Sequence, residues 1–168
     1  ELRGLTHELN QAVGRTYKYS CDAELGDTRC GVNLNGGLFT ATGSVQELLG
    51  FSRWFSSAEL EGFPEQWFTG GVLTWTSGDN AGLSQGVRLF NNSTGTPQIE
   101  LWFPMPYGIQ AEDTFTIVVG CDKQSATCRF RFNNIERFRG FPHMPDPSRI
   151  FAYPDPNAVH DGGSLFDP

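Results

Sequence analysis

The sequence predicts a mainly β protein: a small antiparallel β-barrel or sandwich inserted between two cysteine loops, with a short N-terminal helix and an extended C-terminal tail. Two observations lead to this fold class. The 168 residues include 20 glycines, 10 prolines and 14 phenylalanines, a composition typical of short strands joined by many turns. In residues 38–120, apolar segments with alternating polar residues are separated by glycine turns. These residues are therefore predicted to form the β module, with roughly five to seven strands.

Residues 1–37 precede this β module and are predicted to hold a helix followed by a loop. Apolar residues from Leu2 to Val13 recur at spacings of three and four, and the Thr6 hydroxyl is suited to cap a helix. We expect a short helix from Thr6 to Ala12. Residues 21–37 are rich in turn-forming residues and carry the first cysteine pair, so they are predicted to be a loop.

The strands of the β module are predicted at five alternating segments, with two hairpin tips between them. The segments are residues 38–45, 67–78, 86–92, 99–105 and 113–120, and the tips are residues 77–82 and 91–98. Pro104 and Pro106 cannot donate a backbone hydrogen bond, so the segment that contains them is expected to be an edge strand followed by a turn.

Two segments follow the β module. Residues 121–141 are predicted to be a second cysteine loop joined to a basic and aromatic stretch that carries Arg129, Arg131, Arg137 and Arg139. Residues 142–168 hold six of the ten prolines and show little periodicity, which predicts an extended, surface-wrapping tail.

Length and charge restrict the classes of function. A chain of 168 residues can bury a core without disulfides, and no apolar run approaches the roughly 18 residues of a membrane span. The net charge of -7 disfavours tight binding to nucleic acid. Because the sequence begins without methionine, we expect it to be part of a longer protein.

The four cysteines form two pairs, and both pairs are expected to converge. Eight residues separate Cys21 from Cys30, and six separate Cys121 from Cys128. An antiparallel module often has neighbouring ends, so the two loops can meet. Four thiolates could hold a zinc ion, although zinc knuckles usually have two to four intervening residues. An iron-sulfur cluster accepts more varied spacings. The spacing leaves zinc and an iron-sulfur cluster about equal, with two disulfides behind them and four buried free thiols last.

Other candidate residues favour a structural reading over catalysis. The histidines His7, His143 and His160 are scattered and form no catalytic constellation, so an enzyme is not expected; His143 alone is close enough in sequence to support the cysteine site. The tryptophans are expected in core or interface packing, and the carboxylates show no spacing that singles out a glycosidase pair. The arginines of residues 129–139 are expected to compensate a nearby anionic centre and to join a subunit contact.

Three stretches of the chain resemble the C-terminal half of baseplate hub proteins from gene transfer agents and related siphophages. They are "RGLTHELNQAVGRTYKYSCDAELGDTRCGVNL", "WFTGGVLTWTSGDNAGL" and "ELWFPMPYGIQAEDTFTIVVGCDKQSATCRFRFNNIERFRGFPHMP". The cysteine arrangement is also similar to that of the tail-tip L protein of lambda-like phages, whose C-terminal domain holds an iron-sulfur cluster. The resemblance implies that Cys21, Cys30, Cys121 and Cys128 each ligate one iron of a [4Fe-4S] cluster.

The resemblance also implies partners and a location. The protein is expected in the tail baseplate of a virion or gene transfer agent particle, assembled in the host cytoplasm. There it would form a homotrimer that joins the distal tail protein ring to the central spike or fibre protein, and DNA would pass through its channel without specific binding. Two alternatives stay open: a redox or sensing iron-sulfur or zinc protein, and a secreted, disulfide-bonded carbohydrate-binding β module.

Overall fold

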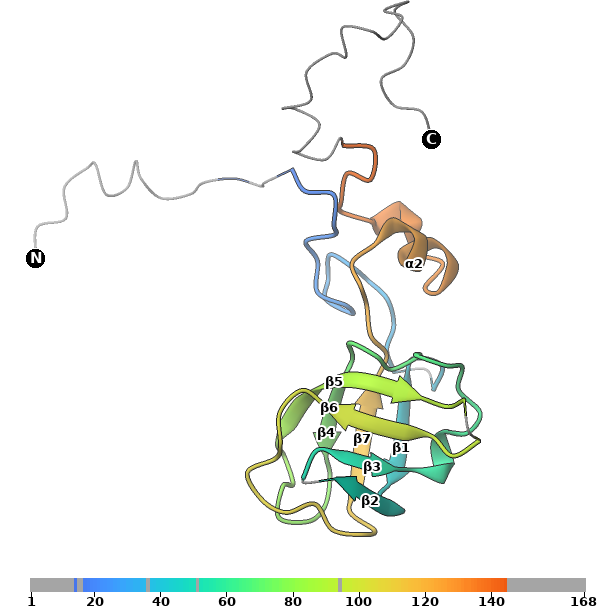
Figure 1. The fold of residues 1–168 in the computed structure, drawn as a ribbon. Helices are drawn as coiled ribbons and strands as arrows, with labels where there is room; N and C mark the ends of the chain where they lie inside the picture. The colour runs from blue at the N-terminus through green and yellow to red at the C-terminus, as the bar shows by residue number, and fades with distance from the viewer. Residues whose placement is uncertain (1–13, 15–16, 36, 51, 94, 145–168) are drawn as a thin grey trace, which may run out of the picture.

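The computed structural model describes residues 14, 17–35, 37–50, 52–93 and 95–144. Within these residues, seven antiparallel strands form one sheet in the order β1-β7-β4-β5-β6-β3-β2 (Figure 1). The strands are β1 (Thr40–Ser44), β2 (Glu47–Gly50), β3 (Trp54–Ser56), β4 (Val72–Trp75), β5 (Ser84–Asn91), β6 (Gln98–Leu101) and β7 (Thr114–Val118). The predicted mainly β class is confirmed.

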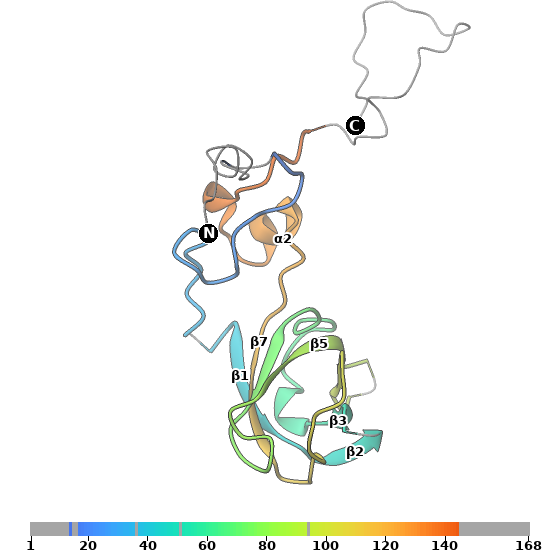
Figure 2. The ribbon, with the colours of Figure 1, turned by 90° about the vertical axis from the view of Figure 1, so that its left-hand side faces the viewer.

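The sheet curves into a half-barrel because its two outer strands follow one another in the chain. Only Val45 and Gln46 separate β1 from β2, although these strands lie at opposite ends of the strand order. The Val45 N–H donates to the Asp113 carbonyl just before β7, and the Gln46 N–H donates to the Ser56 carbonyl in β3. The connection therefore contacts both halves of the sheet and draws them together, as Figure 2 shows.

Each of the five segments predicted as strands overlaps one, although β5 and β6 begin before the predicted segments. Both predicted hairpins are present, since β4 pairs with β5 and β5 with β6. The strands β2 and β3 were not predicted, because they are short and the apolar Leu48 and Leu49 interrupt the alternation. The prediction of an edge strand at β6 was wrong. This strand pairs with both β5 and β3, and the two prolines begin only after its last residue, Leu101.

Aromatic side chains from different walls of the half-barrel meet in its core. Phe55 of β3 contacts Trp75 of β4 and Phe115 of β7, with ring centroids 5.4 and 5.5 Å apart, and Trp75 lies 5.8 Å from Phe115. Large side chains that are almost wholly buried surround them: Leu60, Phe68, Leu73, Val87, Phe90, Ile99, Leu101 and Ile117. Burial of these side chains is the main stabilising contribution to the β module.

Helical structure is sparse among the described residues. It comprises the helix α2 (Ser125–Phe130) and the 3-10 turns η1 (Ala58–Leu60) and η2 (Ile135–Arg137). No helix in this part of the chain has the length and apolarity that crossing a membrane requires. The predicted helix from Thr6 to Ala12 and residues 145–168 of the predicted tail lie outside the described residues.

The helix α2 is a departure from the loop predicted at residues 121–141. Asp122 begins it by accepting two hydrogen bonds, from the Gln124 N–H at 2.9 Å and from the Thr127 hydroxyl at 2.7 Å. The helix buries Cys128 on its inner side. A helix of six residues is too short to form by propensity alone, so the local hydrogen bonds of Asp122 and the burial of Cys128 stabilise it, and no periodic pattern predicts it.

Candidate cofactor site

The pairing of β1 with β7 brings the two cysteine segments together. These strands run antiparallel, with Thr40 opposite Val118. The chain that enters β1 and the chain that leaves β7 therefore lie at the same end of the half-barrel, and both continue into the region above it (Figures 1 and 2). The Cys21 N–H donates to the Lys123 carbonyl at 2.9 Å, which joins the segments across about a hundred residues of sequence.

Gly120 lets the chain leave β7 in contact with a neighbouring loop. A Cβ atom at this position would overlap the carbonyl of Thr69, and one at Gly71 would overlap the carbonyl of Val118. The two backbones can approach this closely only without side chains at both glycines. Cys121 follows directly and packs partly against the hydrophobic core.

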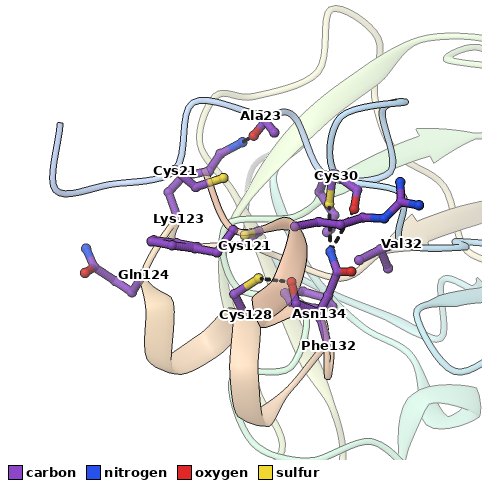
Figure 3. Close-up of a pocket in the computed structure, with 13 residues that line it drawn as sticks. Cys21, Ala23, Cys30, Val32, Cys121, Lys123, Gln124, Cys128, Phe132 and Asn134 are labelled. Atoms are coloured by element: carbon purple, nitrogen blue, oxygen red, sulfur yellow. Dashed lines mark hydrogen bonds between the residues drawn. The ribbon is translucent and has the colours of Figure 1, made fainter. Parts of the chain in front are cut away.

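All four predicted cysteines line one cavity between these segments (Figure 3). The cavity is small, about 20 Å³, and is partly open to solvent. All four are free thiols; Cys128 is buried and the other three are half-buried. Among the residues that the structure describes, no three His, Cys, Asp or Glu side chains are grouped so that they could hold a single metal ion.

The thiols are close enough to affect one another electrostatically. Burial raises the pKa of Cys128 to about 11, and the charges of Cys21, Cys30 and Cys121 add to this rise. Burial also raises the pKa of Cys121. Four thiolates in this cavity would repel one another, and a cationic centre bound between them would remove that repulsion.

The first cysteine loop is shaped by the side chain of Asp27. One of its carboxylate oxygens accepts from the backbone N–H groups of Arg29 at 3.0 Å and Cys30 at 2.6 Å, and the other accepts from Glu24 at 3.2 Å. The hydrogen bond from Cys30 is the largest cause of the lowered pKa of Asp27. This carboxylate therefore fixes the turn that presents Cys30.

Lys123 and Asn134 connect the second cysteine segment to the first. The Lys123 ammonium donates to the Ala23 carbonyl at 2.6 Å and lies 3.1 Å from the Glu24 carboxylate. The Asn134 side-chain amide donates to the Cys30 carbonyl at 2.8 Å and lies 3.8 Å from the Cys30 Sγ atom. Both residues line the cavity and are labelled in Figure 3.

The four predicted arginines take different places, and only Arg137 lines the cysteine cavity. Arg139 forms an ion pair with Asp22 at 2.9 Å. Arg131 lies over the Trp67 ring, 5.0 Å from its centroid, and donates to the Gly120 carbonyl at 3.3 Å. Arg129 and His143 line a separate hollow beside α2. Arg137 and Lys123 are therefore the two cationic side chains that line the cavity with the thiols.

The remaining candidates divide between core and surface. Trp75 is buried in the core as predicted and Trp67 is half-buried, whereas Trp54 and Trp102 are exposed. His7 and His160 lie outside the described residues. Two residues of the site, Asp27 and Asn134, were missed from the sequence. An Asp three residues before a cysteine is a signal for a side-chain-capped turn and could have identified Asp27, but no local pattern marks Asn134.

Comparisons with known proteins match most of the chain. Residues 66–147 match the family described as phage conserved hypothetical protein BR0599, and residues 1–33 match the N-terminal attachment domain of the baseplate hub protein family. A solved structure, the virion of a native gene transfer agent particle, contains a chain 38% identical to this one, with a TM-score of 0.74. The match covers 98% of the present chain but only 56% of the length of that one. No curated protein matches.

Proposed function

We propose that this chain, a tail baseplate protein of the phage and gene transfer agent type, holds a [4Fe-4S] cluster through Cys21, Cys30, Cys121 and Cys128. Its place in the virion tail baseplate follows from the baseplate hub family and the gene transfer agent virion. The cluster is the proposal. One observation carries it: four free thiols from segments far apart in the sequence line a single cavity.

The chemistry of the cavity fits a cluster better than a zinc ion. A zinc ion needs four sulfurs at about 2.3 Å from one point. The described residues hold no group of three or more ligands arranged around one ion, yet the four cysteines surround one space. A [4Fe-4S] cluster takes one cysteine on each of its four irons, so its ligands stand around a larger centre. Lys123 and Arg137 supply positive charge at the rim for a centre with net negative charge.

The proposed role of the cluster is structural. It would join the segment before β1 to the segment after β7 at the end of the half-barrel where both leave the sheet. Each of the four cysteines would form one bond to an iron of the cluster, and these four bonds would hold the two segments in one arrangement. A baseplate component needs such a fixed arrangement, because its neighbours bind surfaces of defined shape.

The partners of this chain are also part of the proposal, and they are inferred from the baseplate hub family. We infer a homotrimer that joins the distal tail protein ring to the central spike or fibre protein around the DNA channel, and this role is structural rather than enzymatic. The net charge of -7 supports a channel wall to which DNA does not adhere during passage.

Metal and sulfide analysis of anaerobically purified protein tests the cluster. We expect about four irons and four sulfides per chain, with a broad visible absorbance band. If the analysis found one zinc per chain, the site would be a zinc site and the cluster proposal would be wrong. Two disulfides without iron, found by mass spectrometry, would favour the secreted module. A reversible absorbance change coupled to a change of shape would instead assign a redox role.

A further inference from the structure

We propose that Asn134 is a positioning residue for the cysteine site, which it serves by holding Cys30 with its side chain and Cys128 with its main chain. The proposal rests on the proposed function for the identity of the bound cluster. The geometry on which the positioning role depends is present in the protein without cofactor and does not require the proposed function. Asn134 is not itself expected to ligate iron.

The side chain of Asn134 contacts the first cysteine segment. Its amide nitrogen donates to the Cys30 carbonyl at 2.8 Å and lies 3.8 Å from the Cys30 Sγ, within the range of hydrogen bonds to sulfur. These contacts span 104 residues of sequence. A carboxamide has two N–H groups, so one can stay on the carbonyl while the other is directed at the sulfur.

The main chain of Asn134 contacts the second cysteine segment. Its N–H donates to the Cys128 carbonyl at 2.9 Å, and its carbonyl oxygen accepts from the Cys128 thiol at 3.2 Å. The preceding Asn133 has a φ of 47°, a left-handed conformation that asparagine and aspartate both tolerate, and its exposed side chain takes no part in these contacts. One residue therefore contacts both loops, and its N–H bond to the Cys128 carbonyl does not depend on the thiol proton, which a cysteine loses when it ligates iron.

Lys123, another donor that lines the cavity, is committed elsewhere. The Lys123 ammonium donates to the Ala23 carbonyl and pairs with Glu24. In the part of the chain that the structure describes, no side-chain N–H other than that of Asn134 lies within hydrogen-bonding distance of a cysteine sulfur. Hydrogen bonds to the sulfurs of a cluster stabilise its more negative state and so raise its reduction potential. Asn134 is thus assigned two effects: it fixes Cys30 beside Cys128, and it raises the potential of the cluster.

The experiment compares Asn134→Ala and Asn134→Asp with the matched control Asn133→Asp. Both aspartates add the same charge at adjacent positions, but only Asn134→Asp removes the donor to Cys30, because Asn133 is exposed. Each protein is purified anaerobically and incubated with ferrous iron and sulfide. We measure iron retention against a chelator and the reduction potential from the visible absorbance.

We expect both Asn134 variants to lower the affinity for iron by about 10–100-fold, the usual effect of losing a partner that orients a ligand. The control should change it by no more than about twofold. In cluster that remains, the potential should fall in Asn134→Asp by more than in Asn133→Asp. Equal affinity and equal potential in all the iron-loaded proteins would overturn the proposal.

A second measurement uses the metal-free protein and separates this proposal from the cluster itself. The rate at which iodoacetamide alkylates Cys30 is followed by peptide mass spectrometry, with Cys21 as the reference in the same digest. We expect faster alkylation of Cys30 in Asn134→Ala, which opens access to the sulfur without adding a charge, and an unchanged rate in the control. If the natural protein takes up no iron but Cys30 reacts as expected, the cluster proposal is wrong and the positioning role of Asn134 is supported. An unchanged rate at Cys30 would overturn the positioning role.

Discussion

The β module (residues 38–120) and the cysteine region (residues 17–35 and 121–144) are held together by different interactions. The large side chains that are almost wholly buried all come from the β module, between Val45 and Ile117. The buried apolar side chains of the cysteine region are fewer and reach 7–9% exposure at Phe132 and Val32. Instead, hydrogen bonds and ion pairs of Asp27, Lys123 and Asn134 shape this region. The contrast indicates that the β module is stabilised mainly by apolar packing, whereas the cysteine region depends mainly on polar contacts.

The dependence between the two regions is unequal. The cysteine segments meet because β1 and β7 pair, so the cysteine region requires the β module. The core of the β module lies within its own strands and contacts the cysteine region only at its end, through residues such as Phe132, whose ring lies 5.3 Å from that of Phe39. Damage to the core should therefore affect both regions, and damage to the cysteines should affect one.

Trp75→Ala should have the largest effect. Trp75 is 1% exposed and contacts Phe55 and Phe115, so its truncation leaves a cavity in the core. We expect a loss of about 3–5 kcal/mol in the free energy of unfolding, measured by denaturant titration, together with weaker iron retention. The control Trp102→Ala removes a tryptophan that is 54% exposed and should cost about 0.5 kcal/mol. Full iron retention in destabilised Trp75→Ala would show that the cysteine region does not depend on the core.

Cys121→Ser should prevent binding of the proposed cluster and leave the β module folded. The hydroxyl replaces one of four thiolates, so we expect loss of the visible absorbance and failure of baseplate assembly, while the far-ultraviolet circular dichroism stays close to that of the natural protein. Ala126→Ser, which adds a hydroxyl at an exposed position of α2, is the control. Normal particles assembled from Cys121→Ser would contradict the structural role of the cluster.

Gly120→Ala tests the junction between the regions. The added methyl group would overlap the Thr69 carbonyl, and the backbone must shift to relieve this. We expect a loss of about 1–3 kcal/mol in the free energy of unfolding and a lower affinity for iron, because Cys121 moves with the junction. Gly108→Ala meets no atom within 4 Å and should be close to neutral. If the two variants behave alike, the close approach at Gly120 is not needed.

Most of the fold could be predicted from the sequence, because alternation and turn residues act locally. The glycine-bounded alternating segments identified β1, β4, β5, β6 and β7, and the turns between them identified two hairpins. The position of β6 inside the sheet could not be predicted, since it depends on the short strand β3, which only tertiary pairing stabilises. The helix α2 was missed because six residues are too few for a periodic pattern, and the burial of Cys128 that helps to stabilise it depends on tertiary packing.

The site could be predicted as far as its thiols but not as far as their supports. An antiparallel module often has neighbouring ends, so the two cysteine pairs were expected to converge, and all four cysteines do line one cavity. Asn134 reaches Cys30 across 104 residues, and such a contact leaves no trace in local spacing. His143 follows the second pair closely in sequence yet lies in another hollow, which shows how weak a guide sequence proximity is.

Asp27→Ala should have a moderate effect, confined to the cysteine region. The variant removes the acceptor of the Glu24, Arg29 and Cys30 N–H groups, and the turn before Cys30 loses its shape. We expect the affinity for iron to fall about tenfold, measured by chelator competition, without a change in the melting of the β module. The exposed Asp79→Ala is the control for the lost charge. Unchanged affinity would mean that the four sulfurs organise the loop by themselves.

Glu100→Gln should have the smallest effect, because it weakens a polar cluster of the β module instead. Glu100 lies 2.7 Å from the Arg88 guanidinium and 3.4 Å from that of Arg53, and both arginines are about half exposed. Exposed ion pairs contribute little, so we expect a loss below about 1 kcal/mol in thermal unfolding, smaller still at high salt, and no change in iron affinity. Asp27 and Glu100 are both carboxylates with several polar partners, but only Asp27 shapes a cysteine loop. If Glu100→Gln destabilised the protein by several kcal/mol, polar contacts would also hold the β module, and the contrast between the two regions would fail.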